Sequence, residues 1–170
     1  ESPINRLSIG IQSFFEEDLK LMNRAQNVEE AENCLQIASK YFDNISIDLI
    51  YGMPNMSVAR WKKNIEKALR FNVPHISSYA LTVEPKTALA KYVEQKLIIP
   101  ATDEETQEHF NVLYKILLEA GFDCYEISNF GKPGYFSKNN SAYWQQKKYM
   151  GIGPSAHSFD GQRRGWNINN

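Results

Sequence analysis

Cysteine is scarce in this sequence, and its scarcity restricts the metal chemistry that the chain can support. The 170 residues include two cysteines, Cys34 and Cys124, which lie far apart and have no metal-binding spacing. Structural zinc sites and iron–sulfur clusters need more ligands at closer spacing. We therefore assign no residue of this chain to a metal, and we expect both cysteines to be buried side chains that fill the core.

Hydrophobic runs of membrane-spanning length are also missing, and the first residues have neither the basic nor the apolar region of a signal peptide. The 19 basic residues nearly balance the 20 acidic residues, so neither nucleic acid nor an anionic membrane is predicted as a partner. With 42% hydrophobic residues, the composition is that of a soluble globular protein of one or two domains. We expect a cytoplasmic protein. Its strand-like start and abrupt end suggest a piece of a longer one.

A short apolar segment, Ser46–Pro54, carries a single acidic residue and then breaks at a glycine and a proline. Its length and composition predict a strand that is covered on both faces, as in a parallel sheet, and that ends in a loop. Asp48 is the exception within it, because a buried carboxylate costs free energy unless it is hydrogen-bonded or paired. Two interpretations stay open at this point. Asp48 serves the fold through a fixed partner, or it binds a ligand.

Strand-like and helix-like patterns alternate along the first half of the chain, which favours right-handed β-α-β units and a parallel sheet. Asn27 and Thr102 are each followed three residues later by a glutamate and predict capping boxes, and Gly121 predicts a helix C-cap. From residue 129 onward the composition is typical of loops and small strands. The expected strands are 5–12, 46–51, 75–83 and 122–127, and the expected helices are 16–24, 28–42, 57–71 and 102–120.

Parallel strands bring their carboxyl ends to one edge of a sheet, where α/β proteins place their ligands. Gln12, Tyr51 and Thr82 are expected at or near that edge. Arg24 follows the first helix and could reach over the edge with its fork of donors, although an arginine at a helix end is more often only a favourable partner for the helix dipole.

The three histidines differ in their sequence context. His157 follows Gly151 and Gly153, two glycines that we expect to let the backbone approach a neighbour closely, and it is a candidate for a ligand contact. His109 is expected to lie on a helix face in contact with solvent.

Four segments, in this order, resemble a known family: Asn5–Ser13, Asn23–Arg24, Ile47–Pro54 and Gly151–Ser158. This is the radical S-adenosylmethionine family of oxygen-independent coproporphyrinogen III oxidases and their haem-chaperone relatives. The resemblance runs from about residue 3 to residue 166 and implies an α/β fold, a parallel-sheet fragment of a partial (β/α) barrel. Residues 1–128 would form the second half of that barrel, and residues 129–170 would form a loop-rich extension that packs on the barrel edge.

The resemblance also implies that essential parts lie outside this sequence. In the family, a 4Fe-4S cluster is held by a CxxxCxxC loop after the first barrel strand, and a glycine-rich stretch after the second strand receives the methionine end of S-adenosylmethionine. Neither occurs here. The chain would start near the fourth barrel strand. It would be inactive alone, and no catalytic residue is assigned to it.

Carried over residue by residue, Gln12, Arg24 and Asp48 match positions at which the oxidases contact S-adenosylmethionine. Thr82 and His157 also match contact positions, through backbone atoms, because the oxidases carry other residue types there. In the oxidases some of these positions serve a second S-adenosylmethionine.

The segments Tyr125–Phe130 and Asn140–Trp144 resemble the haem-chaperone branch, as does the Gly-Pro-Ser-Ala-His form of the glycine loop. The pattern of that branch is HNxxYW. Asn139 stands here in place of its histidine, and an amide is a poor substitute for imidazole on iron.

The resemblance leaves three functions open for the parent protein. The expected function is that of a haem chaperone that binds haem and delivers it to acceptor proteins. The alternatives are a true oxidase that decarboxylates porphyrin propionates and a non-enzymatic module for another small ligand. A half barrel leaves an unpaired strand edge, so we also expect the fragment to self-associate.

Overall fold

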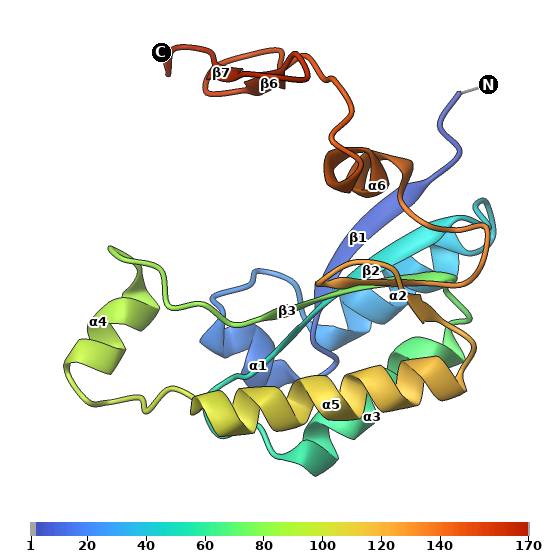
Figure 1. Ribbon diagram of the computed structural model, residues 1–170. Coiled ribbons are helices and arrows are strands. Elements are labelled where there is room, and N and C mark those ends of the chain that lie inside the picture. Colours follow the sequence, from blue (N-terminus) through green and yellow to red (C-terminus); the bar gives the residue numbers. More distant parts are fainter. Residues whose placement is uncertain (1–2, 170) are drawn as a thin grey trace. The chain divides into compact units, whose positions relative to one another are not determined.

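The computed structural model describes residues 3–169, and the chain divides into two compact units, residues 1–135 and 136–170. Figure 1 follows the secondary structure of each unit along the chain. Among the helices of residues 3–169, none has the length and apolar character needed to span a membrane.

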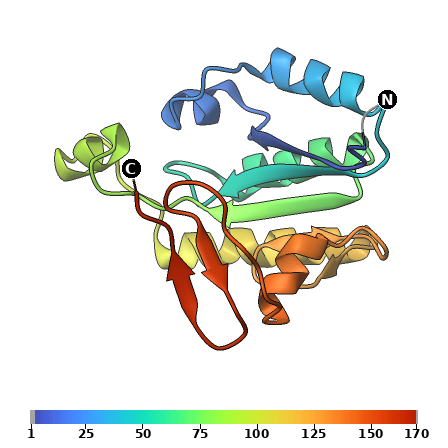
Figure 2. The ribbon, with the colours of Figure 1, turned by 90° about the horizontal axis from the view of Figure 1, so that it is seen from above.

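The first unit is built on a five-stranded sheet with the strand order β1-β2-β3-β5-β4. Three strands are parallel and run side by side in Figure 2, as the alternation of strands and helices predicted: β1 (Leu7–Gln12), β2 (Ile45–Tyr51) and β3 (His75–Ala80). The sheet of the described residues does not close, because β1 and β4 lie at opposite edges.

The expected fourth strand at 122–127 is wrong in length. Strand β4 (Asp123–Cys124) has two residues, and it pairs antiparallel with β5 (Asn129–Gly131), which in turn pairs antiparallel with β3. The cause is a tight reversal between them, closed by a hydrogen bond from the Tyr125 amide to the carbonyl oxygen of Asn129 at 3.3 Å. A short reversal joins antiparallel strands, whereas parallel strands need a long crossover.

Four helices follow the sequence pattern closely. They are α1 (Glu16–Leu21), α2 (Val28–Ala38), α3 (Val58–Arg70) and α5 (Asp103–Glu119). The predicted capping boxes at Asn27 and Thr102 are both formed, and Gly121 has a φ of +81°, as its predicted place at a helix end requires. Helix α4 (Ala88–Glu94) was not expected, because it has seven residues and buries none of them.

The two faces of the sheet differ because apolar and polar residues alternate along the strands. Ile45, Ile47 and Leu49 of β2 are buried in a single apolar core to which α2, α3 and α5 contribute Leu35, Ile65, Leu113 and others. Figure 1 shows α3 and α5 running next to each other along one side of the sheet. Ser46 and Asp48, between the apolar residues of β2, therefore lie on the other face. We call this face, with its polar residues, the inner face.

The prediction that both cysteines are buried is wrong for Cys34, which is exposed on α2. The buried stripe of this helix consists of Ala31, Leu35 and Ala38, and position 34 faces away from it. Cys124 is partly buried.

The second unit contains a short helix and a hairpin. Helix α6 (Lys138–Trp144) begins after Ser137, and strands β6 (His157–Phe159) and β7 (Arg164–Trp166) pair antiparallel. Small strands were predicted for this region, and the helix was not. The division of the chain at residue 128 and the packing of the extension on the barrel edge stay predictions.

One buried side chain ties α3 to the turn after β1. Asn64 has no exposed surface, and its Oδ1 accepts the amide of Phe14 at 2.7 Å and the hydroxyl of Ser13 at 3.2 Å. The Ser13 hydroxyl also contacts buried Asp18 at 2.6 Å. The turn that carries β1 into α1 therefore depends on this amide.

We predict that Asn64→Leu lowers the free energy of unfolding by about 1–3 kcal/mol, because the buried amide of Phe14 loses its acceptor without gaining another. Chemical denaturation measures the loss. Asn111→Leu, at an exposed position of α5, is the matched control and should change stability by less than about 0.5 kcal/mol. Equal stability of the two variants would contradict the role of Asn64.

Candidate functional site

The carboxyl end of β1 is irregular at Gln12. The pairing with β2 shifts register between Gly10 and Gln12, and Gln12 has a φ of +69°. The amide of Ser13 donates to the carbonyl oxygen of Ile11 at 2.9 Å, which closes a three-residue turn around Gln12. A γ-turn with positive φ is rare and strained for a residue with a side chain. Such strain persists only where the surroundings impose it, and it concentrates at functional sites.

The side chain of Gln12 folds back over Gly10. A Cβ placed on Gly10 would come within 2.5 Å of Gln12 Nε2, so the amide occupies the space that a side chain at residue 10 would fill. The side chain of Gln26 binds the same stretch of backbone, because its Nε2 donates to the carbonyl oxygen of Gly10 at 2.8 Å. Gln12 itself is buried.

Asp48 lies in a row of residues that crosses the sheet in register. Gly10 of β1 pairs with Asp48, Asp48 pairs with Ser77, and Ser77 pairs with Asn129 of β5. Side chains of register partners point to the same face of a sheet. The amide of Gln12 over Gly10 and the carboxyl of Asp48 are therefore neighbours on the inner face.

The positive charge of Arg24 affects the pKa of the Asp48 carboxyl. Burial raises the pKa of the Asp48 carboxyl above its ordinary value, and the Ser77 hydroxyl and the positive charge of Arg24 partly oppose this rise. Arg24 itself is exposed, in the segment between α1 and α2. The amide of Gln12 thus lies on the same face as the half-buried carboxyl of Asp48, and the positive charge of Arg24 acts on that carboxyl.

The other two predicted residues belong to different units of the chain. Thr82 is exposed in the segment after β3, next to Leu81, whose amide donates to the carbonyl oxygen of Tyr51 at 2.8 Å. It lies at the carboxyl edge of the sheet, as expected. His157 belongs to the second unit, where its ring lies 6.2 Å from that of Trp166.

The glycine loop of the second unit makes the close backbone approach that was predicted. A Cβ on Gly151 would collide with the carbonyl oxygen of His157. The side chain of Asn167 donates to the carbonyl oxygens of Gly151 and Gly153, the latter at 2.8 Å. Glycine at position 151 therefore serves the folding of this loop.

A second polar row, nearer the amino ends of the strands, was not recognised from the sequence. The Ser46 hydroxyl is 2.7 Å from His75 Nδ1, and His75 Nε2 is 2.7 Å from the hydroxyl of Tyr125. Burial and then the charge of Arg6 lower the pKa of His75 to about 4. Alternation along β2 and β3 places Ser46 and His75 beside Asp48 and Ser77, and this two-residue offset was the available signal.

The expectation that His109 is solvated is wrong. His109 is 2% exposed, burial lowers its pKa, and its Nδ1 accepts the amide of Gly52 at 3.3 Å. Its carbonyl oxygen accepts Trp61 Nε1 at 2.9 Å. The histidine holds the loop after β2 against α5. Its spacing of four residues from Leu113 and eight from Leu117, the other buried residues of this helix, was the available signal.

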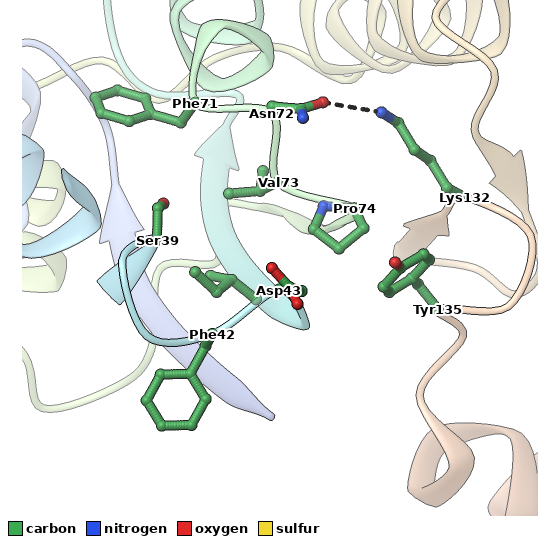
Figure 3. Close-up of a pocket in the computed structure, with 10 residues that line it drawn as sticks. Ser39, Phe42, Asp43, Phe71, Asn72, Val73, Pro74, Lys132 and Tyr135 are labelled. Atoms are coloured by element: carbon green, nitrogen blue, oxygen red, sulfur yellow. Dashed lines mark hydrogen bonds between the residues drawn. The ribbon is translucent and has the colours of Figure 1, made fainter. Parts of the chain in front are cut away.

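A pocket of about 480 Å³ lies at the opposite ends of the strands, near the start of β2 and the residue before β3. Figure 3 shows its lining, with Lys132 donating to Asn72 Oδ1 at 3.2 Å. Phe42, Val73 and Tyr135 also line it. None of the five predicted site residues does. Within residues 3–169, no group of three or more histidines, cysteines and acids could hold a metal ion.

Comparisons with known proteins agree with the resemblance seen in the sequence. The chain is 32% identical over 160 residues to the heme chaperone HemW of Lactococcus lactis, covering 94% of this chain and 42% of that protein. It is 38% identical over 156 residues to the mitochondrial radical S-adenosyl methionine domain-containing protein 1 of Danio rerio, covering 91% and 35%. The chain thus spans about two fifths of the length of the curated relatives it matches. No protein-family model matches it.

Among solved structures, the coproporphyrinogen III oxidase HemN of Escherichia coli, a radical SAM enzyme, matches with a TM-score of 0.77 and 22% identity. The match covers 99% of this chain and 42% of HemN. The expected fold, a parallel-sheet fragment of a radical S-adenosylmethionine partial barrel, is confirmed. The resemblance to the coproporphyrinogen III oxidase-like radical S-adenosylmethionine proteins, on their haem-chaperone side, is confirmed as well.

The lowered pKa of His75 predicts how the stability of the protein depends on pH. Between about pH 6.5 and 4 the unfolded chain binds a proton at His75 and the folded chain does not, so stability is lost as the pH falls through this range. Between pH 7 and pH 4.5, the free energy of unfolding of the wild type should fall by roughly 2–3 kcal/mol more than that of the His75→Gln variant. Buried carboxyls with raised pKa act in the opposite direction in both proteins and cancel in the difference.

Denaturation curves of both proteins at the two pH values measure this difference. Parallel loss of stability in wild type and variant would show that His75 does not titrate as described.

Proposed function

We propose, from its similarity to HemW-like radical S-adenosylmethionine proteins, that the chain forms the second half of the S-adenosylmethionine-binding barrel of a haem chaperone. The observation that carries this proposal is the convergence of Gln12, Arg24 and Asp48 on one face of the parallel sheet. Binding of haem and its delivery to acceptor proteins belong to the proposal, as does a cytoplasmic location.

The inner face has the donors and acceptors that S-adenosylmethionine needs. Asp48 offers carboxyl oxygens to hydroxyl or amino donors of the cofactor, and Gln12 and Arg24 complete a polar ring around it. Burial of Asp48 strengthens such contacts, because water competes less for the carboxyl. Thr82 and His157 are proposed to contribute backbone contacts. When bound and reduced, S-adenosylmethionine supplies a 5'-deoxyadenosyl radical, and the residues of this chain would bind and orient it.

The 4Fe-4S cluster does not fit the residues of this chain. Cys34 and Cys124 lie on α2 and β4 and are too few to hold it. We propose that its ligands lie in a part of the protein that precedes residue 1.

Self-association of the fragment stays a proposal. Strand β1 is an edge of the sheet, and an exposed edge offers unpaired backbone groups to another chain.

A true oxidase is the second candidate function, and the likeness of the fold to HemN is what favours it. At 22% identity, the likeness to HemN concerns the fold alone. A small-ligand module without radical chemistry is the third. The three differ in what the full-length protein does with porphyrin and haem.

We expect the full-length protein, reconstituted anaerobically with S-adenosylmethionine, to bind haem stably and to leave coproporphyrinogen III unconverted. Absorption spectra follow haem, and chromatography follows the porphyrinogens. Formation of protoporphyrinogen would show an oxidase. Binding of neither haem nor S-adenosylmethionine would leave the small-ligand module.

The role of Asp48 is tested by Asp48→Asn in the same protein. The amide keeps the shape and one acceptor but loses a charge-assisted hydrogen bond, which is worth about 1.5–3 kcal/mol. We predict an affinity for S-adenosylmethionine that is roughly tenfold to a hundredfold weaker, with a nearly unchanged melting temperature in its absence. Calorimetric titration and thermal melts measure the two quantities. Unchanged affinity together with clear destabilisation would refute the cofactor role of Asp48.

A further inference from the structure

Two successive carbonyl groups near the end of β1 converge on one side chain. Gln26, partly buried in the segment between α1 and α2, donates from its Nε2 to the carbonyl oxygen of Gly10 at 2.8 Å and to that of Ile11 at 3.2 Å. Both neighbours are acceptors, so the amino end of the amide faces them. In a regular strand, successive carbonyl groups point to opposite sides and do not share a donor. The pair of bonds therefore depends on a kink in β1.

The kink is the strained turn at Gln12. The register with β2 shifts between Gly10 and Gln12, the φ of Gln12 is +69°, and the Ser13 amide donates to the same carbonyl oxygen of Ile11 that Gln26 binds. If residue 12 took an ordinary negative φ, the strand would straighten and the two carbonyls would separate. A side chain shifts an equilibrium toward the conformation in which it makes its bonds. Gln26 therefore favours the strained turn over a relaxed strand.

The turn determines where the amide of Gln12 lies. Residues two apart in a regular strand stand side by side on one face. Here the side chain of Gln12 folds back instead, and its Nε2 would be 2.5 Å from a Cβ on Gly10. Gly10 is the register partner of Asp48. The folded-back conformation thus brings the amide of Gln12 to the row of the sheet that contains Asp48.

We propose that Gln26 is a positioning residue for the cofactor site: by binding the carbonyls of Gly10 and Ile11 it holds the strained turn at Gln12, and so holds the amide of Gln12 in place for the ligand. This inference rests on the proposed binding of S-adenosylmethionine on the inner face. Gln26 acts through Gln12 and is assigned no contact with the cofactor.

Gln26→Met tests this role in the full-length protein, because methionine has nearly the same length and no donor. Loss of the hydrogen bonds lets the turn relax, and we expect the affinity for S-adenosylmethionine, measured by calorimetric titration, to weaken roughly three- to tenfold. Gln36→Met, at an exposed position of α2, is the matched control and should leave the affinity within about 1.5-fold of the wild type. Unchanged affinity in Gln26→Met, with or without a lower melting temperature, would overturn the proposal.

A double-mutant cycle separates the route through Gln12 from a route through Arg24. Gln26 follows Arg24 by two residues, so the same bonds also tie the segment that carries Arg24 to β1. If Gln26 acts through Gln12, Gln26→Met should weaken the affinity by less than about twofold in the Gln12→Ala protein. An equal loss in both backgrounds would show that Gln26 acts elsewhere, and the proposal would be overturned.

Gly10→Ala provides a second variant that leaves the side chain of Gln26 unchanged. The new Cβ occupies the space of Gln12 Nε2 and should displace that amide, which we expect to weaken the affinity at least threefold. In the Gln12→Ala protein the space is free, and Gly10→Ala should then cost less than about twofold. Equal losses in the two backgrounds, or no loss in either, would show that the place of the Gln12 amide does not matter. Either result overturns the proposal even if Gln26→Met fails to fold.

Hydrogen exchange at Ser13 separates this inference from the proposed function, because it needs no cofactor. The Ser13 amide closes the turn by donating to Ile11, and Ser13 has no exposed surface. We expect its exchange, resolved by mass spectrometry with fragmentation, to be roughly three- to tenfold faster in Gln26→Met and unchanged in Gln36→Met. If the wild type does not bind S-adenosylmethionine, the proposed function fails, while exchange at Ser13 still shows whether Gln26 holds the turn. Equal exchange in wild type and Gln26→Met would refute the positioning role.

Discussion

The candidate site depends on the register of the parallel sheet. Gly10 of β1, Asp48 of β2 and Ser77 of β3 are register partners in the parallel strands, and Ser77 is the partner of Asn129 in antiparallel β5, so one row of side chains crosses the inner face. A shift of one residue in β2 would turn Asp48 into the apolar core and bring Ile47 or Leu49 to the inner face. The same pairing that buries the core therefore sets the position of the carboxyl.

Burial of polar groups on the inner face has a cost that the fold offsets with hydrogen bonds. The row of Ser46, His75 and Tyr125 is linked internally, and so is the row from Ser77 to Glu126. Asp48 joins the second row at its end, where the amide of Gln12 and the charge of Arg24 are close. The carboxyl is thus half-buried, with Ser77 beside it in register on β3.

Much of the fold follows from local patterns, and the errors have local causes. The capping boxes at Asn27 and Thr102 and the three parallel strands were predictable, because each depends on residues close in sequence or on simple alternation. The reversal at Tyr125 was not, since the strand-like pattern of residues 122–127 gives no sign of a turn in which the Glu126 carboxylate accepts the Ser128 amide. His109 was misjudged although a local signal was present, because it lies four residues before Leu113 and eight before Leu117 on the buried stripe of α5. Its contact with the loop at Gly52, which is distant in sequence, was not visible.

The sequence by itself determined that Asp48 is a carboxylate on a buried strand, that Gln12 ends the preceding strand, and which family the chain resembles. These properties depend on residue types, short spacings and the order of motifs. Only the tertiary structure decided that Gln12 folds over Gly10 in a strained turn and that Ser77, Asn129 and Glu126 stand behind Asp48. Those relations arise between strands separated by helices and loops, and strand register, which no local pattern encodes, is the physical reason that they exist.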